Sequence, residues 1–212
     1  MKYEQFVEKV CDVPVIETQS FITGISDSKS LTVQLSRWVR TGKLIQLKRG
    51  FYLLPIKYRK VEPNEFYLAS MLQKPSYVSL EKALEYHDLI PEAVSVFTSV
   101  TTKRPLKLKT AAGTYKYRHI KPLLFFGYNS VKKDRQIFFI ASPEKALLDL
   151  FYLRHSKLTQ EYLDELRLQN TEKINLGKLA LFARRFHKPK MKVVARMLKQ
   201  YIKTSRGGEK KL

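Results

Sequence analysis

Residues 28–55 read SKSLTVQLSRWVRTGKLIQLKRGFYLLP. Leu31, Leu35 and Trp38 recur at the spacing of one helical face, which predicts a helix with one buried stripe. Gly42 follows the last periodic position and suits the C-terminal end of that helix. Short polar side chains alternate with long cations on the other faces, so the helix is predicted to be apolar on one side and basic on the other.

The segment LIQLKRGFYLL then places two apolar arms around Lys48, Arg49 and Gly50. Gly50 permits the positive φ of a tight turn, so the arms predict a β-hairpin with a basic tip. Residues 3–11 and 16–22 carry apolar residues at helical spacing and predict two preceding helices. This order of two helices, a basic helix and a basic hairpin is typical of a winged helix-turn-helix.

A winged helix predicts binding to duplex DNA. Arginine reads guanine edges with two hydrogen bonds, and short side chains let the backbone approach the bases. Cations at the hairpin tip would contact phosphate or the minor groove. The predicted DNA-binding residues are Lys29, Ser30, Thr32, Ser36, Arg37, Arg40, Lys43, Lys48 and Arg49. The alternative is a small solvated helix–hairpin domain whose lysines only aid solubility.

The charge balance favours an anionic partner. The chain has 212 residues, with 40 Lys and Arg against 19 Asp and Glu, for a net charge of +21. Residues 156–212 alone carry a net charge of +10. A polyanion is the expected partner because neutralising phosphates releases condensed counterions. An acidic protein partner would be attracted by the same field.

The composition makes several kinds of site improbable. Cys11 is the single cysteine, so neither an intramolecular disulfide nor a thiolate zinc site is expected. The histidines are far apart in the sequence, so we expect no metal site. Neither a P-loop nor a GxGxxG motif occurs, and we expect no cofactor. Neither a signal peptide nor an apolar run near 18 residues occurs, which predicts a cytoplasmic protein, or a nuclear one in a eukaryote, without membrane contact.

The chain is predicted to be α+β: a winged helix-turn-helix, then a mixed α+β domain with a helical C-terminal part. The boundary falls at the basic segment IKYRKVEP, which gives domains at 1–60 and 61–204 and a disordered basic tail at 205–212. Short helices are expected at PNEFYLASML and SLEKALEYHDL. Strands are expected at 77–79, 94–102, 107–110, 114–120 and 136–141.

Residues 142–154, SPEKALLDLFYLR, predict a helix with a serine N-cap, proline in the first turn and an early glutamate. The pattern S-x-E-K-A-L also occurs at 79–84, after another strand. We attribute both copies to good helix starts, with an internal duplication as the alternative. The last predicted helix has a possible further basic surface formed by Lys192, Arg196, Lys199 and Lys203.

Four segments in this order resemble the AbiEi family of abortive-infection antitoxins and transcriptional regulators. After the predicted winged helix these are YVSLEKALEYHDLIPE, VFTSVTTKR, GTYKYRHI and IASPEKALLDLFYL. The resemblance covers residues 5–155 well and the helical C-terminal part loosely. The basic C-terminus departs from what toxin binding alone requires.

The resemblance implies two activities and no catalytic residue. The winged helix would bind inverted repeats upstream of its own bacterial operon and repress it. The second domain would neutralise a nucleotidyltransferase-like toxin. The resemblance transfers the DNA role to the basic helix and hairpin tip named above.

Two other functions stay open at this stage. One is an enzyme, in which a metal-dependent nuclease or a nucleotidyltransferase-like domain is fused to a DNA-binding module. For the nuclease, Asp134, Glu144 and Lys145 loosely match the acidic and basic residues that hold a metal near a phosphate. Helix capping accounts for Glu144 without catalysis, so we expect a protein that is not an enzyme. The third possibility is a protein that binds an acidic partner and has no DNA role.

Overall fold

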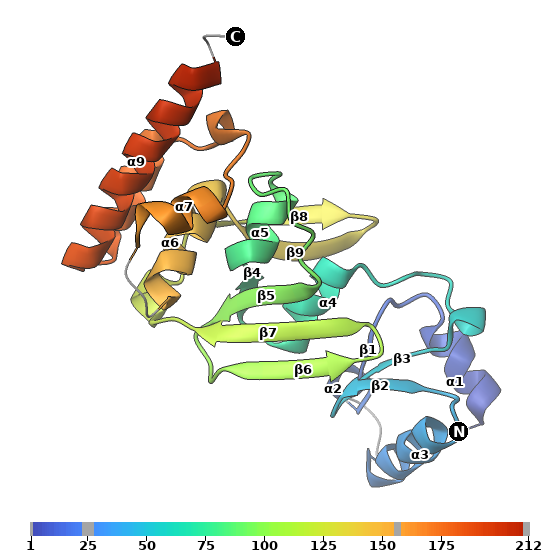
Figure 1. The fold of residues 1–212 in the computed structure, drawn as a ribbon. Coiled ribbons are helices and arrows are strands. Elements are labelled where there is room, and N and C mark those ends of the chain that lie inside the picture. Colours follow the sequence, from blue (N-terminus) through green and yellow to red (C-terminus); the bar gives the residue numbers. More distant parts are fainter. Residues whose placement is uncertain (1, 23–27, 155–157, 210–212) are drawn as a thin grey trace.

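The computed structural model describes residues 2–22, 28–154 and 158–209, and for residues 21, 22, 28, 29 and 206–209 it describes the backbone alone. The chain is a mixed α+β protein, as its sequence predicts. In Figure 1 a small sheet with its helices lies at one end, a large sheet lies in the middle, and the C-terminal helices lie at the other end.

The N-terminal part combines three helices with a small antiparallel sheet of strand order β1-β3-β2. Its elements are α1 (Tyr3–Val10), β1 (Ile16–Glu17), α2 (Thr18–Ile22), α3 (Ser28–Arg40), β2 (Ile45–Lys48) and β3 (Phe51–Leu53). The predicted first helix, basic helix and hairpin are therefore present. Apolar residues from α1, α3 and the sheet form one buried cluster.

The predicted second helix at 16–22 is wrong at its start. Ile16 and Glu17 form strand β1, which pairs with Tyr52 and Phe51, and the helix begins only at Thr18. Backbone pairing with β3 satisfies the hydrogen-bonding groups of this segment, a partnership that local periodicity does not reveal. The predicted turn at 24–28 lies largely outside the described residues.

The large sheet has the strand order β6-β7-β5-β4-β9-β8. Its strands are β4 (Ser76–Val78), β5 (Val96–Thr101), β6 (Leu106–Thr110), β7 (Gly113–His119), β8 (Tyr128–Lys133) and β9 (Gln136–Ala141). The pairs β4/β9 and β5/β7 are parallel, and the others are antiparallel. The sequence does not predict strand β8, because YNSVKK is mostly polar and the strand lies at an exposed edge of the sheet.

Helices cover both faces of the large sheet. On one face the hydroxyl of Tyr117 donates to the carbonyl of Ala69 in α4 over 2.8 Å. On the other face α5 and α6 pack together, each following one of the parallel strands β4 and β9. The bounds are α4 (Glu65–Leu72), α5 (Leu80–Tyr86), α6 (Pro143–Leu153), α7 (Gln160–Glu165), α8 (Leu176–Arg185) and α9 (Pro189–Glu209), with short 3-10 turns at Ile56–Tyr58, Pro122–Leu124 and Thr171–Lys173.

The two S-x-E-K-A-L segments start α5 and α6, but their serines act differently. Ser142 caps α6 by accepting a hydrogen bond from the Lys145 amide. The Ser79 hydroxyl makes no cap and donates to the Asp149 carboxylate over 2.9 Å. The explanation that both serines serve as helix caps is therefore wrong at Ser79, because a buried carboxylate competes for its hydroxyl.

The predicted disordered tail is wrong for residues 205–209, which continue α9 to Glu209. Residues 210–212 lie outside the described residues. Earlier turns of α9 bury Met191, Val194 and Leu198, so the helix is already nucleated by packing. Extending it through two glycines costs only about 1 kcal/mol each relative to alanine.

The segment between the two predicted domains is fixed to the large sheet. The Gln136 side chain of β9 accepts from the Asn64 amide and donates to the Glu62 carbonyl, each over 2.9 Å. Asn64 in turn caps α4. The N-terminal sheet therefore connects to the large sheet through a hydrogen-bonded segment.

Candidate nucleic-acid interface

The apolar stripe of α3 anchors this helix to the N-terminal core. Leu31, Leu35 and Trp38 are buried, as their spacing predicts. The Trp38 ring packs against Tyr3 and Phe6 of α1 with ring centroids 5.3 and 4.8 Å apart. Aromatic pairs of this kind add to the burial of apolar area. The orientation of α3 about its own axis is therefore fixed by its buried face.

The opposite face of α3 is exposed and carries most of the predicted DNA-binding residues. The exposed side chains are those of Ser30, Thr32, Ser36, Arg37 and Arg40. Arg37 and Arg40 are three residues apart and so lie on one side of the helix. The sequence of α3 contains no carboxylate. The Lys29 backbone belongs to α3, but its side chain is not described.

Two further features describe the chemistry of this face. The Ser36 hydroxyl donates to the Thr32 carbonyl over 3.0 Å, which keeps it close to the backbone. Val33 is 57% exposed beside these polar groups. An exposed apolar side chain on such a face suits contact with a thymine methyl group.

A Schellman motif ends α3 and positions Lys43. The Lys43 amide donates to the Trp38 carbonyl over 2.8 Å, and the Gly42 amide donates to the Val39 carbonyl over 3.1 Å. Gly42 has φ +71°, as this cap requires. The Lys43 ammonium lies 4.8 Å from the centre of the Tyr3 ring. The exposed Lys43 side chain therefore lies beside the C-terminal end of the helix.

The hairpin tip differs from its predicted geometry at Lys48. Gly50 makes the turn with φ +84°, and Arg49 is exposed. Lys48 is partly buried instead, and its ammonium donates to the Leu72 carbonyl at the end of α4. Burial lowers the pKa of Lys48, and the nearby cations Lys103 and Lys74 lower it further. The predicted contact of Lys48 with phosphate does not match this arrangement.

Apolar contacts explain why Lys48 turns inward. Val15, Leu47 and Leu53 of the N-terminal part are buried in the same cluster as the core of the large sheet. Glu17 and Lys74 form an ion pair of 3.3 Å across this junction. The sequence indicates this junction in one way, because the hairpin has more apolar residues than one buried face can hold. The hairpin is therefore also part of the junction between the two predicted domains.

The basic face of α9 lies far from α3. Lys192, Arg196, Lys199 and Lys203 are exposed, while the apolar stripe of α9 is buried. Figure 1 places α9 and α3 at opposite ends of the molecule. The two basic surfaces therefore do not form one continuous face.

The buried polar network around Lys145 and Asp149 of α6 is not among the features predicted from the sequence. Lys145 and Asp149 form an ion pair in which both side chains are fully buried. Asp149 also accepts from Tyr77 over 2.8 Å and from Ser79 over 2.9 Å. Burial raises the pKa of Asp149 and lowers that of Lys145. The signal in the sequence is a Lys and an Asp four residues apart in a mostly apolar helix.

The residues of the alternative nuclease hypothesis are not arranged as a metal site. The Glu144 carboxylate accepts from the Asn175 amide over 2.9 Å and from Ser142 over 2.8 Å, and it pairs with Lys178 at 3.1 Å. Asp134 is exposed in the turn between β8 and β9. Among the described residues, no group of three or more His, Cys, Asp or Glu side chains could hold a metal ion.

Neither a scan against protein-family models nor a search of curated proteins gave a match to this chain. Within the described part of the chain, no helix combines the length and apolar character needed to cross a bilayer.

Proposed function

We propose that this protein binds duplex DNA, with α3 as the recognition helix of a winged helix-turn-helix. The observation that carries the proposal is the exposed Arg37 and Arg40 face of α3, whose other side is fixed in the N-terminal core. A recognition helix needs a buried stripe for orientation and an exposed basic face for the groove. The order α1, β1, α2, α3, β2, β3 supports the assignment to a winged helix.

The roles of the predicted residues differ in this proposal. Arg37 and Arg40 read base edges, because arginine makes two hydrogen bonds to guanine in the major groove. Arg49 at the hairpin tip and Lys43 beside the helix end contact phosphates, which position the protein without reading sequence. Lys48 is withdrawn from this set, since its ammonium already has a carbonyl partner.

The biological role rests on the resemblance to the AbiEi family. We infer that the protein is a bacterial cytoplasmic repressor of its own operon and the antitoxin of a nucleotidyltransferase-like toxin. The order of the four resembling segments around the large sheet supports this inference. The engagement of Glu144 in helix and backbone contacts supports a protein without catalytic activity.

Fluorescence anisotropy tests the DNA proposal. Labelled duplexes from the region upstream of the operon are compared with a scrambled duplex, at two salt concentrations. Arg37→Ala or Arg40→Ala should cost about 1–3 kcal/mol on the operator and less on the scrambled duplex. Arg135→Ala, which removes an exposed arginine in the β8–β9 turn, is the matched control. Operator affinity as high in the α3 variants as in this control would refute the assignment.

A second experiment tests the antitoxin role. The chain is co-expressed with the product of the neighbouring reading frame, and bacterial growth is measured. Rescue by the wild type and by Arg37→Ala alike would separate toxin neutralisation from DNA binding. Metal-dependent cleavage of plasmid DNA that is lost in Glu144→Ala would contradict the non-enzymatic proposal.

A further inference from the structure

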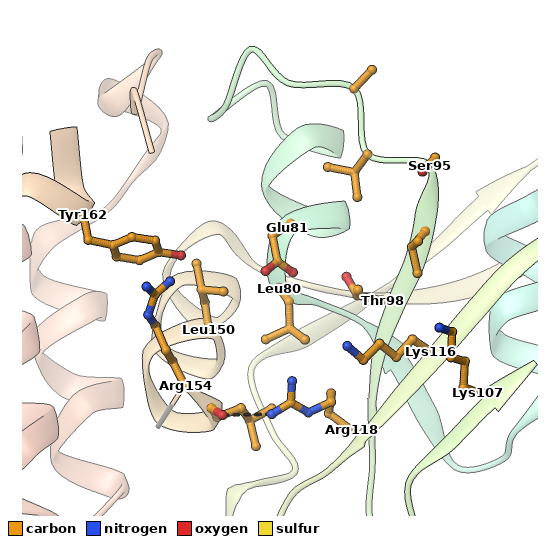
Figure 2. Close-up of a pocket in the computed structure, with 14 residues that line it drawn as sticks. Leu80, Glu81, Ser95, Thr98, Lys107, Lys116, Arg118, Leu150, Arg154 and Tyr162 are labelled. Carbon is orange, nitrogen blue, oxygen red and sulfur yellow. Dashed lines mark hydrogen bonds between the residues drawn. The ribbon is translucent and has the colours of Figure 1, made fainter. Parts of the chain in front are cut away.

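A cavity of about 530 Å³ opens in the large-sheet domain, and all its lining residues lie between positions 80 and 162. Figure 2 shows side chains from several strands and helices around it, among them Thr98 of β5. Lys107, Lys116 and Arg118 come from β6 and β7, Leu80 and Glu81 from α5, and Arg154 and Tyr162 from α6–α7. Pockets of roughly 300–1,000 Å³ hold small organic ligands.

The sheet wall of the cavity concentrates positive charge. Lys107 lies directly opposite Lys116 in the antiparallel register of β6 and β7. Like charges at directly opposed positions destabilise a sheet, and an anion between them removes that repulsion. The sequences of β6 and β7 contain no carboxylate. None of the ion pairs among the described residues includes either lysine.

Arg118 extends the same wall, two residues after Lys116. Its guanidinium donates to the Leu153 carbonyl over 2.9 Å, so its position is fixed before any ligand arrives. Side chains two apart on a strand point to the same face. The wall therefore offers three neighbouring cations, an arrangement that suits the several charges of a phosphate chain.

The rest of the cavity suits the organic part of such a ligand. Leu80 and Leu150 line it with apolar surface. The Arg154 guanidinium carbon lies 3.5 Å from the centre of the Tyr162 ring, a cation–π contact between two residues that line the cavity. Aromatic rings and guanidinium planes stack on nucleobases. Glu81 supplies a carboxylate away from the sheet wall, and a carboxylate can accept hydrogen bonds from ribose hydroxyls.

We propose that this cavity binds a nucleoside phosphate. The phosphates lie against Lys107, Lys116 and Arg118, and the nucleoside lies against the apolar surface and the Arg154–Tyr162 pair. The Glu81 carboxylate repels phosphate on the α5 side of the cavity, so the ligand binds in one orientation. The inference is independent of DNA binding by α3, because none of the lining residues belongs to the N-terminal elements.

Isothermal titration calorimetry of the full chain tests the proposal with four probes: ATP, GTP, adenosine and pyrophosphate. We expect at least one nucleotide to bind with a Kd below about 1 mM. Adenosine and pyrophosphate should each bind more weakly than that nucleotide. Absence of nucleotide binding in this range would overturn the proposal, and pyrophosphate binding as tightly as the nucleotides would overturn the nucleoside part.

Matched variants separate a specific site from general attraction to a basic protein. Lys116→Ala should weaken nucleotide binding by about tenfold, because a charge-assisted contact is lost. Lys109→Ala is the control, since Lys109 is an exposed cation on the same strand as Lys107 but does not line the cavity. Lys107→Ala replaces Lys116→Ala if the latter does not fold. Equal weakening in the control and in the cavity variants would refute the site.

Discussion

Replacing Lys145 with methionine tests the buried ion pair within α6, whose Asp149 also accepts a hydrogen bond from Tyr77 of β4. The side chains of Lys145 and Asp149 are both fully inaccessible to solvent. The Lys145 ammonium also lies within 5.5 Å of the ring centres of Tyr77, Phe126 and Phe186. Methionine has a similar length and suits these apolar surroundings. The substitution therefore removes the charge while leaving little empty space.

The expected loss of stability depends on which partners Asp149 retains in the variant. It retains the hydroxyl donors Tyr77 and Ser79 but loses the cation with which it pairs. Removing one partner of a buried ion pair costs about 3–5 kcal/mol, because the other charge stays buried. For a chain of this size that corresponds to a decrease in Tm of roughly 6–20 °C. Because burial already raises the pKa of Asp149, the cost should shrink as the pH falls and the carboxyl takes up a proton.

The assay is urea and thermal unfolding followed by circular dichroism. Lys173→Met is the control, because Lys173 pairs with Asp88 at 2.8 Å where both side chains are exposed. Exposed pairs contribute about 0–1 kcal/mol. Adding Asp149→Asn to Lys145→Met should recover about 1–3 kcal/mol, because a neutral amide oxygen still accepts from Tyr77 and Ser79. A loss no greater than that of Lys173→Met, or no recovery in the double variant, would refute the reasoning.

Three further predictions concern Lys48, Arg49 and Glu144. Lys48→Met should lower the free energy of unfolding by about 1–3 kcal/mol and leave the salt dependence of DNA binding unchanged, because the Leu72 carbonyl loses its donor. Arg49→Ala should instead reduce the salt slope by about 1 and leave the unfolding midpoint unchanged, and the opposite pattern would contradict both assignments. Burial raises the pKa of Glu144, but hydrogen bonds from Asn175, Ser142 and Lys178 outweigh it and hold that pKa below 4.5. The unfolded state therefore binds more protons just below pH 4.5, so stability should fall as the pH drops through this range. Glu144→Gln should flatten this acid limb in a pH series of thermal melts, and an unchanged limb would contradict the assigned contacts.

The sequence determined the features that depend on local order. Apolar spacing placed Leu31, Leu35 and Trp38 on the buried side of α3, and the same spacing left Arg37 and Arg40 exposed. Glycines with positive φ ended that helix and made the hairpin turn. Serine and proline started α6. Each of these depends on residues within a few positions of one another, so periodicity and capping preferences suffice to predict them.

Tertiary structure alone decided the features that depend on distant partners. Strand β1 exists because β3 pairs with it, and β8 exists because β9 does. Lys48 turns from the predicted phosphate contact to the Leu72 carbonyl, 24 positions away in the chain. Ser79 serves Asp149 instead of its own helix. In each case a hydrogen bond with a distant segment competes with the local preference. The spacing of residues along the chain does not identify that distant partner.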